Sequence, residues 1–295
     1  MTRRTRLLAV ALAVVQVVVL GVASSTAARR WVAAPLDDGD AYVLLVLGSD
    51  EGPPRGGSAR SGRADGFHLL VVDARRTHVS ILSFPRDSWV EVPGLGRTKI
   101  NASLTRGPEA AVATAEGVTG LRVDDWILTG FHGLIAAVDE LGGVTVDVEQ
   151  RLYDPVGASS DLQPGTQVLD GWQALTYVRD RKSRPDGDIG RTASHARLLQ
   201  SAHRQVRADG ADAADVMRLV SLVRRHAETS VPAGRMVRLT ALALTIPPEQ
   251  VVRRVVPGQV GSAGAASVIH LTPAAEALFA QLRETGRLDG GDDQP

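Results

Sequence analysis

Six consecutive apolar residues, Tyr42 to Leu47, constrain the fold of this chain more than any other segment. The run is shorter than most helices, and it lacks the alternation of apolar and polar residues expected of a strand with one solvent-facing side. We therefore expect a strand that is buried on both faces, as in a sheet covered by helices on both sides. The run ends in Gly48-Ser49-Asp50, which places a carboxylate at the edge of that sheet.

Other segments predict the elements that would accompany this strand. Asp73 to Arg76 has the length and polarity of a hairpin turn, and Thr272-Pro273 supplies a capping hydroxyl before a proline in the first turn of a helix. Further strands are expected at Phe67 to Val72, Val79 to Phe84, Val144 to Val148 and Val251 to Val256. Helices are expected at Ala110 to Val118, Leu134 to Leu141, Gly171 to Val178 and around Leu198, Ala202 and Val206, with further helical patterns after Asp212. This mixture favours one α/β domain.

The N-terminal residues 7 to 28 carry no charge. At about 1.5 Å per residue, a helix of this length reaches roughly 30 Å, which is enough to cross a bilayer. Arg3, Arg4 and Arg6 precede it and favour a cytoplasmic N-terminus, which would place the rest of the chain outside the membrane. The alternative is a cleaved signal peptide, with Ser25-Thr26-Ala27 as the small-residue cleavage site.

We therefore predict a single-pass membrane protein with one large extracytoplasmic domain. Pro35 and the acidic residues that follow it mark a short linker between the two parts. The expected layout is a cytoplasmic tail at 1–6, a transmembrane anchor or signal peptide at 7–28, a linker at 29–40 and the extracytoplasmic domain at 41–295.

Composition excludes several classes of function. Lys+Arg and Asp+Glu number 33 each, so no overall positive charge points to nucleic acid. The sequence has no cysteine, which excludes disulfides, thiolate catalysis and thiolate metal sites. It also lacks a Gly-x-Ser-x-Gly elbow, a His-Glu-x-x-His helix and a Gly-Lys-Ser/Thr phosphate loop. Its bias toward Arg, Ala, Val and Gly is typical of a GC-rich genome, such as an actinobacterial one.

Two carboxylates, Asp50 and Asp65, lie beside predicted strands and could converge at one edge of the sheet. Carboxylate oxygens are hard ligands, and a pair with few acidic neighbours suits Mg²⁺ beside a substrate phosphate. The alternatives are a loop cap for Asp50 and a structural ion pair between Arg63 and Asp65. Spacing alone leaves both interpretations open.

Arginines gather in the same segments and again further along the chain. These residues are Arg63, Arg86, Arg179, Arg181 and Arg191. A guanidinium binds phosphate oxygens through two hydrogen bonds and stays charged at any working pH, so several of them suit a pyrophosphate. Each could alternatively form a surface ion pair worth less than about 1 kcal/mol, and Arg179 and Arg181 share a face only if the backbone there is extended. Together with the carboxylates, these residue types favour metal-assisted phosphate chemistry in which charge stabilisation supplies most of the catalysis.

A series of segments, in their order and spacing, resembles the LytR-CpsA-Psr family of bacterial cell-envelope glycopolymer ligases. The matching segments are Val43 to Asp50, Arg63-Ala64-Asp65, Ser83 to Ser88, Lys99-Ile100-Asn101, Val138 to Val144, Leu169 to Leu175, Tyr177 to Arg181 and Asp188 to Arg191. These core motifs cover about residues 42–206, and we expect residues 207–288 to complete the same domain.

The resemblance implies a three-layer α/β/α domain with a mixed central sheet and an apolar cleft that holds a polyprenyl chain. Members of the family move a glycopolymer from a polyprenyl-pyrophosphate carrier to peptidoglycan, which forms a phosphodiester link and releases polyprenyl phosphate. This chain would then be a Mg²⁺-dependent phosphotransferase, with Mn²⁺ as an alternative metal, outside the cytoplasmic membrane. Its partners would be the lipid-linked glycopolymer, the peptidoglycan acceptor and the membrane, and not nucleic acid.

The same resemblance implies roles for individual residues. Asp50 and Asp65 would hold the metal ion. The pyrophosphate would be bound by Arg63, Arg86, Arg179, Arg181, Arg191 and His195. The catalytic residues would be Asp65, Arg86, Arg179 and Arg181. As general base, the carboxylate of Asp65 is preferred over Arg86, whose pKa would have to be strongly lowered.

The last matching motif departs from the family pattern, which continues Gly-Arg-x-x-Arg-Gln. Here Ser194-His195 stands in place of Arg-Gln. Histidine can donate a hydrogen bond and adds charge when protonated, so we hypothesise that His195 binds phosphate with a strength that depends on pH between about pH 5.5 and 8. The departure also leaves open a paralogue that binds polyprenyl pyrophosphate, or hydrolyses it, without ligase activity.

Overall fold

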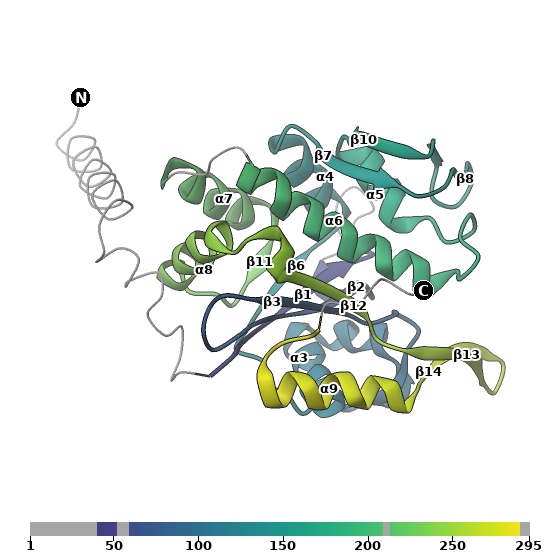
Figure 1. The fold of residues 1–295 in the computed structure, drawn as a ribbon. Helices are drawn as coiled ribbons and strands as arrows, with labels where there is room; N and C mark the ends of the chain where they lie inside the picture. Colours follow the sequence, from purple (N-terminus) through teal and green to yellow (C-terminus); the bar gives the residue numbers. More distant parts are fainter. Residues whose placement is uncertain (1–39, 52–58, 209–212, 290–295) are drawn as a thin grey trace.

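The computed structural model describes residues 40–51, 59–208 and 213–289, which are coloured in Figure 1. The expected anchor at 7–28 lies outside these ranges, as does the expected linker up to residue 39. Within them, no helix has both the length and the apolar character that crossing a membrane requires.

In the described part of the chain, a mixed sheet of six strands forms the centre of the domain, in the order β11-β6-β1-β2-β3-β12. β1 pairs antiparallel with β2 and parallel with β6, while β3 pairs antiparallel with β2 and parallel with β12. Strands β1, β3, β6 and β12 therefore all end at one edge of the sheet, where β2 begins. The bounds are Tyr42–Ser49 for β1, Ala64–Val72 for β2, Val79–Ser83 for β3, Asp125–Thr129 for β6, Glu228–Thr229 for β11 and Val251–Val255 for β12.

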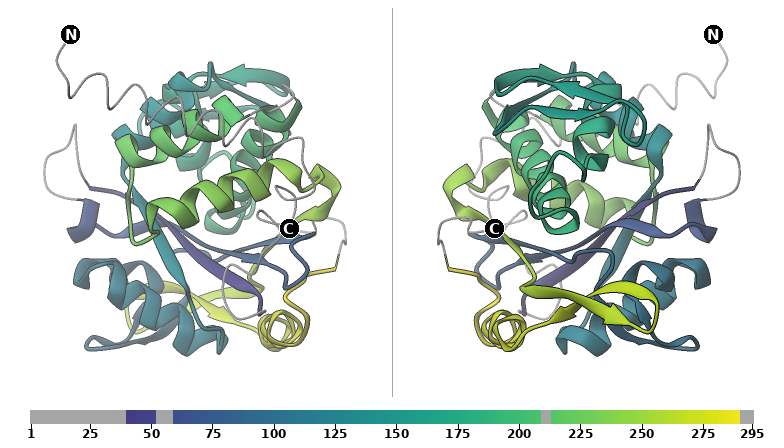
Figure 2. Two further views of the ribbon diagram at one scale, coloured as in Figure 1. Left: turned by 90° about the vertical axis from the view of Figure 1, so that its left-hand side faces the viewer. Right: turned by 90° about the vertical axis from the view of Figure 1, so that its right-hand side faces the viewer.

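Helices cover both faces of this sheet and give a three-layer α/β/α arrangement (Figures 1 and 2). One face carries α3 and α9, and the other carries α6 and α8 with α4, α5 and α7 beside them. The helices are α3 (Pro108–Thr119), α4 (Phe131–Glu140), α5 (Gly171–Arg179), α6 (Asp188–Ala208), α7 (Ala213–His226), α8 (Ala233–Thr245) and α9 (Pro273–Thr285).

Short elements connect these layers. The 3-10 helices are η1 (Ala59–Ser61), η2 (Ile100–Arg106) and η3 (Pro248–Gln250). Two-stranded sheets pair β4 (Trp89–Val92) with β5 (Gly96–Lys99), β7 (Val144–Val148) with β10 (Gly165–Leu169), β8 (Leu152–Asp154) with β9 (Ser160–Leu162), and β13 (Gly258–Ala263) with β14 (Ala266–Leu271). The β4–β5 and β13–β14 hairpins belong to the α3 and α9 side of the sheet, whereas β7–β10 lies beyond α4 and α5.

Strand β1 is buried on both faces, as its apolar run predicts. Val43, Leu45 and Leu47 pack into the core formed with α3 and α9. Tyr42 and Leu44 instead face α6 and α8. Full burial of a large apolar side chain stabilises a fold by about 1.5–3 kcal/mol, so this one strand contributes to both helical layers.

The expected strands and helices are all present, with ends that shift by a few residues. β2 begins at Ala64 rather than Phe67, so Asp65 belongs to the strand itself. The turn after β2 is confirmed, because the Asp73 carboxylate accepts hydrogen bonds from the backbone amides of Thr77 and His78 at 2.8 and 2.7 Å.

Two aspects of the local prediction are wrong. Pro273 does start α9, but the Thr272 hydroxyl does not cap it and instead lies 3.4 Å from the carbonyl oxygen of Pro257. The strands β4, β5, β6, β8, β9, β10, β11, β13 and β14, most of them short, were not expected. β13 reads Gly-Gln-Val-Gly-Ser-Ala, in which only Val260 has high strand propensity, so pairing with β14 is what explains its conformation.

Candidate functional site

The edge where β1, β3 and β12 end gathers the polar side chains of the candidate site. Asp50 follows β1, Asp65 is the second residue of β2, and Arg86 follows β3. The register between β1 and β2 shifts at Gly48 and Ser49, so Asp65 lies at an irregularity in the ladder. In α/β sheets, ligands bind beyond the carboxyl ends of the strands, which is the position of these side chains.

A cluster of alternating charges occupies this edge. Arg86 donates a hydrogen bond to Asp65, and its Nε lies 3.8 Å from Asp87 and 3.9 Å from Asp188. Arg191, in the first turn of α6, pairs with Asp188. Burial alone would lower the pKa of Arg86, but the charge of Asp65 and its hydrogen bond raise that pKa above the ordinary value. We call these five residues the charged cluster.

Several atoms of the charged cluster lack a hydrogen-bond partner among the described residues. They are Arg86 Nε, Arg191 Nε and Asp188 Oδ2, and all are buried. A buried polar atom without a partner costs about 1–3 kcal/mol, so such atoms indicate a place where a ligand completes the bonding. Two guanidinium Nε groups suit an anion. Burial raises the pKa of the Asp188 carboxyl, although the charge of Arg191 opposes this.

Asp50 takes part in a local cap. Its Oδ1 accepts a hydrogen bond from the Arg63 amide at 2.6 Å, and its own amide donates to the Arg63 carbonyl at 3.0 Å. This is the loop cap that the sequence allowed, whereas Asp65 pairs with Arg86 and not with Arg63. The Arg63 amide contacts Oδ1 of Asp50, and Arg86 contacts Oδ1 of Asp65. The second oxygen of each carboxylate suits a hard cation.

The donor set for such a cation is small. No group of three or more His, Cys, Asp or Glu side chains within the described ranges is placed to hold a metal ion. Asp50 and Asp65 alone therefore fit Mg²⁺ only in the manner in which that ion is usually held beside phosphates, with few carboxylates and with substrate oxygens and water as the other ligands.

An apolar pocket of about 100 Å³ lies beside the charged cluster, between the sheet and helices α4, α5 and α6. Asp65 and Arg179 contribute to its wall, and the Arg179 guanidinium lies 5.0 Å from the centre of the Phe131 ring. Its apolar lining includes Val46, Leu134, Leu175, Leu198 and Leu199. Most ligand pockets exceed about 300 Å³, so a long apolar ligand would have to displace side chains here.

His195 projects into the same pocket from α6. Its Nε2 donates to the Val178 carbonyl at 2.7 Å, which leaves Nδ1 unprotonated, and a Cβ added to Gly66 would lie 3.0 Å from that Nδ1. Although the ring keeps some exposure to the pocket, its burial, followed by the charge of Arg191, lowers the pKa of His195 to about 3. A pKa lowered this far opposes the expectation that His195 gains charge between about pH 5.5 and 8, because it favours the neutral imidazole over that range.

The remaining predicted residues lie around this centre. Arg179 shares the pocket with Asp65, whereas Arg63 and Arg181 are exposed. Asp180, between Arg179 and Arg181, has φ −66° and ψ 121°, so the backbone is extended where it leaves α5. The structure thus joins Arg86 to Asp65 directly and to Arg191 through Asp188, and it adds Arg179 and His195 through the pocket. Arg63 adjoins Asp50 through its backbone.

Sequence reasoning missed several residues of the site. Asp188 lies three residues before Arg191, and this helical spacing for an ion pair was a usable signal. Arg184 is buried beneath the site with its guanidinium 5.4 Å from the centre of the Tyr177 ring, and nothing in the local sequence separates it from a surface arginine. His68 is fully buried, with Nδ1 2.8 Å from the Ser83 hydroxyl.

Comparisons with known proteins place this arrangement in a family. A model of the LytR_cpsA_psr family matches residues 21–284. The chain is similar to a probable cell wall biosynthesis protein, LcpB of Corynebacterium glutamicum, at 44% identity over 138 residues, which are 46% of this chain and 32% of LcpB. It is also similar to the polyisoprenyl-teichoic acid–peptidoglycan teichoic acid transferase TagU of Oceanobacillus iheyensis, at 35% identity over 170 residues, 55% of this chain and 51% of TagU.

These relatives are longer than the region of similarity, and the matched part spans about half of TagU and a third of LcpB. Among solved structures, Bacillus subtilis TagV has the same fold, with a TM-score of 0.72 at 22% identity over 84% of this chain and 98% of TagV. A LytR-Csp2A-Psr enzyme from Actinomyces oris gives a TM-score of 0.67 at 20% identity, over 81% of this chain and 89% of that one.

Proposed function

The chain belongs to the LytR_cpsA_psr family, and we propose that it is a phosphotransferase that moves a glycopolymer from a polyprenyl-pyrophosphate carrier to peptidoglycan. The observation that carries the proposal is the position of the charged cluster directly beside an apolar pocket, with Asp65 belonging to both. A lipid pyrophosphate has an anionic head and an apolar chain, so its binding site needs both charged groups and an apolar pocket. The similarity to LcpB and TagU, which are named for cell wall biosynthesis and teichoic acid transfer, supports the same assignment.

The donor would bind with its pyrophosphate at the charged cluster and its lipid in the pocket. Arg86 and Arg191 offer their unpartnered Nε groups to phosphate oxygens, and charge-assisted hydrogen bonds of this kind are roughly twice as strong as neutral ones. Arg179, held over Phe131 at the pocket wall, reaches the place where the phosphates meet the lipid. Displacement of leucine side chains would admit the polyprenyl chain.

In the transfer step, a hydroxyl oxygen of the acceptor attacks the phosphorus that carries the glycopolymer. The bond from this phosphorus to the bridging oxygen breaks, polyprenyl phosphate leaves, and the hydroxyl proton passes to a carboxylate. We assign proton acceptance to Asp188, because a raised pKa brings a carboxyl closer to the pH at which a general base is most effective. Asp65, which the sequence favoured as the base, instead accepts the hydrogen bond of Arg86, whereas Oδ2 of Asp188 has no hydrogen-bond partner among the described residues.

Asp50 and Asp65 would hold Mg²⁺, or Mn²⁺ in its place, and the bound ion would neutralise negative charge on the phosphate oxygens. The arginines of the charged cluster act on the same oxygens, so they hold the donor in position whatever the metal contributes. The uncharged residues 7–28 would anchor the chain in the cytoplasmic membrane with the domain outside, next to the lipid carrier and the wall.

The proposal is tested with the full chain in detergent micelles, supplied with a polyprenyl-pyrophosphate-linked saccharide and Mg²⁺, with and without soluble peptidoglycan fragments. The measured quantity is the release of polyprenyl phosphate. Release that rises with acceptor and yields a saccharide-linked fragment is the expected result. Release that ignores the acceptor would identify a hydrolase instead, and tight donor binding without release would identify a lipid carrier.

A further inference from the structure

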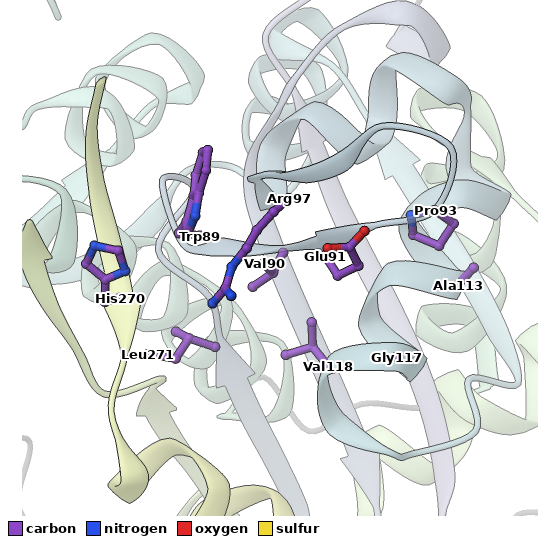
Figure 3. Close-up of a pocket in the computed structure, with 10 residues that line it drawn as sticks. All are labelled: Trp89, Val90, Glu91, Pro93, Arg97, Ala113, Gly117, Val118, His270 and Leu271. Atoms are coloured by element: carbon purple, nitrogen blue, oxygen red, sulfur yellow. The ribbon is translucent and has the colours of Figure 1, made fainter. Parts of the chain in front are cut away.

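A second cavity, of about 540 Å³, lies on the opposite face of the sheet, between β4, β14 and α3 (Figure 3). β4 and β14 meet at one point, where Ser88 bridges Ile269 and the Ile269 amide donates to the Asp87 carbonyl at 2.9 Å. Beyond this bridge each strand pairs with its own hairpin partner. The space between them is the cavity, which we call the β4–β14 groove.

The β4–β14 groove combines an aromatic surface, charged groups and an apolar floor. Trp89 is partly exposed, and Figure 3 shows Arg97 pointing toward the side of the groove where Trp89, His270 and Leu271 lie. Val118 and Leu271 supply apolar lining. The cavity volume lies within the range of about 300–1,000 Å³ that is usual for small-molecule sites. An indole ring packs against the flat apolar face of a sugar ring, and a guanidinium binds carboxylate oxygens. Glu91 lies opposite Arg97 in the β4–β5 ladder and also lines the groove, where its carboxylate can accept hydrogen bonds from sugar hydroxyls. The lining therefore suits a saccharide that carries hydroxyls together with a carboxylate.

The groove begins beside the charged cluster. Lys99 lies opposite Trp89 in the β4–β5 ladder, and its Nζ is 3.0 Å from Oδ2 of Asp87. Asp87 in turn lies 3.8 Å from Arg86. Trp89 follows Arg86 by three residues, a stretch that spans at most about 11 Å even when fully extended. A chain of a few sugar rings could therefore occupy the groove and reach the phosphates at the same time.

The geometry of phosphoryl transfer decides whether the groove would hold a sugar of the donor or a sugar of the acceptor. The attacking and leaving oxygens lie roughly in line on opposite sides of the phosphorus. The leaving polyprenyl phosphate belongs to the pocket on the α5 and α6 face of the sheet. The acceptor hydroxyl must then arrive from the other side, and the β4–β14 groove lies on that side with α3.

We propose that the β4–β14 groove binds the acceptor, a carboxylate-bearing saccharide fragment of peptidoglycan, with Trp89 against a sugar ring and Arg97 on a carboxylate. The inference rests on the proposed function for its direction of transfer. Binding of the saccharide can also be measured without catalysis, because the residues that line the groove are not those of the charged cluster.

The first test measures binding of a soluble disaccharide-peptide fragment of peptidoglycan to the full chain by calorimetry, without donor. Trp89→Ala and Arg97→Ala should each raise the dissociation constant about tenfold, which is about 1.4 kcal/mol. Trp89→Phe should restore most of the affinity, since it keeps an aromatic surface. Trp172→Ala is the matched control, because Trp172 is 52% exposed at the start of α5 and should not affect binding. Equal affinity in all variants, or no binding by the wild type, would overturn the proposal.

The second test separates the groove from the proposed function. In the transfer assay, Trp89→Ala should raise the KM for the acceptor about tenfold, with a much smaller change in the KM for the donor. A higher KM for the donor instead would overturn the acceptor assignment. If the wild type neither transfers nor hydrolyses the donor, the proposed function fails, and the calorimetric comparison still decides whether the groove binds the saccharide.

Discussion

Asp65 at the start of β2 accepts a hydrogen bond from Arg86 in the segment after β3, so the pair connects the ends of two neighbouring strands. The side chains of Arg86 and Asp65 are only 23% and 13% exposed, which shields the pair from water more than an ordinary surface ion pair. Removing one partner of such a pair is costly because the other keeps an uncompensated charge. Arg86 thus has a structural contact through Nη1, while its Nε remains available to a substrate.

Arg86→Lys tests this division of roles. Lysine keeps the positive charge but loses the planar fork that binds two groups at once. We expect transfer to slow by about 10²-fold or more, the usual loss when one donor to a transition-state charge is removed, while the chain stays folded. Arg151→Lys is the control, since Arg151 pairs with Asp161 at an exposed position. Turnover at the wild-type rate in Arg86→Lys would contradict the assignment of Arg86.

Local sequence patterns predicted the strands that position the site but not the contacts between its side chains. The run before Asp50 and the short strand before Arg86 could be recognised because burial and length are features of neighbouring residues. The approach of Asp188 to Arg86 joins residues from different elements, and no local pattern encodes it. His195 could be identified as a departure from the family motif, yet its neutral state depends on surrounding protein that only the folded structure reveals.

The β4–β14 groove was beyond sequence reasoning for the same reason. It exists because Ser88 meets Ile269 from a distant part of the chain, and because β13, with two glycines, pairs with β14 in a hairpin that its own composition does not favour. No motif in the sequence singles out Trp89, whose ring lines the groove and is partly exposed.

Asp188→Asn tests the proton acceptor. Loss of the base should slow transfer by at least about 10²-fold. In the wild type, the rate should fall as pH drops through the raised pKa of Asp188, because the carboxyl becomes protonated. The residual activity of Asp188→Asn should lack this acid limb, and Asp161→Asn should retain it. The same limb in Asp188→Asn would show that another group accepts the proton.

The raised pKa of Asp188 also fixes the direction in which this residue changes the free energy of unfolding with pH. A pKa raised in the folded state means that folding disfavours the charged carboxylate, so this penalty is absent at low pH and appears as pH rises through the folded pKa. The amide removes this penalty, and it also removes the negative charge that pairs with Arg191. The free energy of unfolding of Asp188→Asn from urea titration should therefore rise relative to that of the wild type as pH increases through the raised pKa, and a folded variant at the assay pH separates a catalytic loss from misfolding.

Asp65→Asn tests the metal pair. The amide keeps the shape of the side chain and an oxygen acceptor for Arg86, but it removes a negative charge from the pair that would hold Mg²⁺. Chelation of divalent ions should abolish transfer by the wild type, and added Mg²⁺ should restore it. Asp65→Asn should need at least about tenfold more Mg²⁺ for half-maximal activity. Unchanged Mg²⁺ dependence would remove Asp65 from the metal site.

Leu134→Phe tests the lipid pocket. Leu134 lines the pocket from α4, and a larger ring there fills space that the polyprenyl chain would need. We expect the KM for a long-chain donor to rise about tenfold and the KM for a short-chain analogue to change little, since the analogue reaches less of the pocket. Overpacking costs about 1–3 kcal/mol, so thermal unfolding is measured alongside. Leu239→Phe, in the core between α6 and α8, is the control for overpacking alone, and an equal effect on both donors would contradict the lipid assignment.

The lowered pKa of His195 predicts that the folded protein loses stability in acid. Its pKa in the folded protein is lowered to about 3, chiefly by burial, whereas an imidazole in an unfolded chain titrates near about pH 6.5. As pH falls below that value the unfolded chain takes up the proton first, so the free energy of unfolding decreases by about 1.4 kcal/mol per pH unit until the folded pKa is reached. Above about pH 7 both states are neutral and His195 contributes no pH dependence.

His195→Gln should remove this part of the slope. Urea titrations at pH 7, 6 and 5 should therefore show a stability difference that shifts in favour of the variant as pH falls, by about 1 kcal/mol or more at pH 5. Part of the slope should remain, because burial also lowers the pKa of His68. His132→Gln, at an exposed position in α4, is the matched control and should follow the wild type. Parallel curves for His195→Gln and the wild type would mean that His195 is protonated in the folded protein at mildly acidic pH, and a charged ligand for phosphate would then be restored as its role.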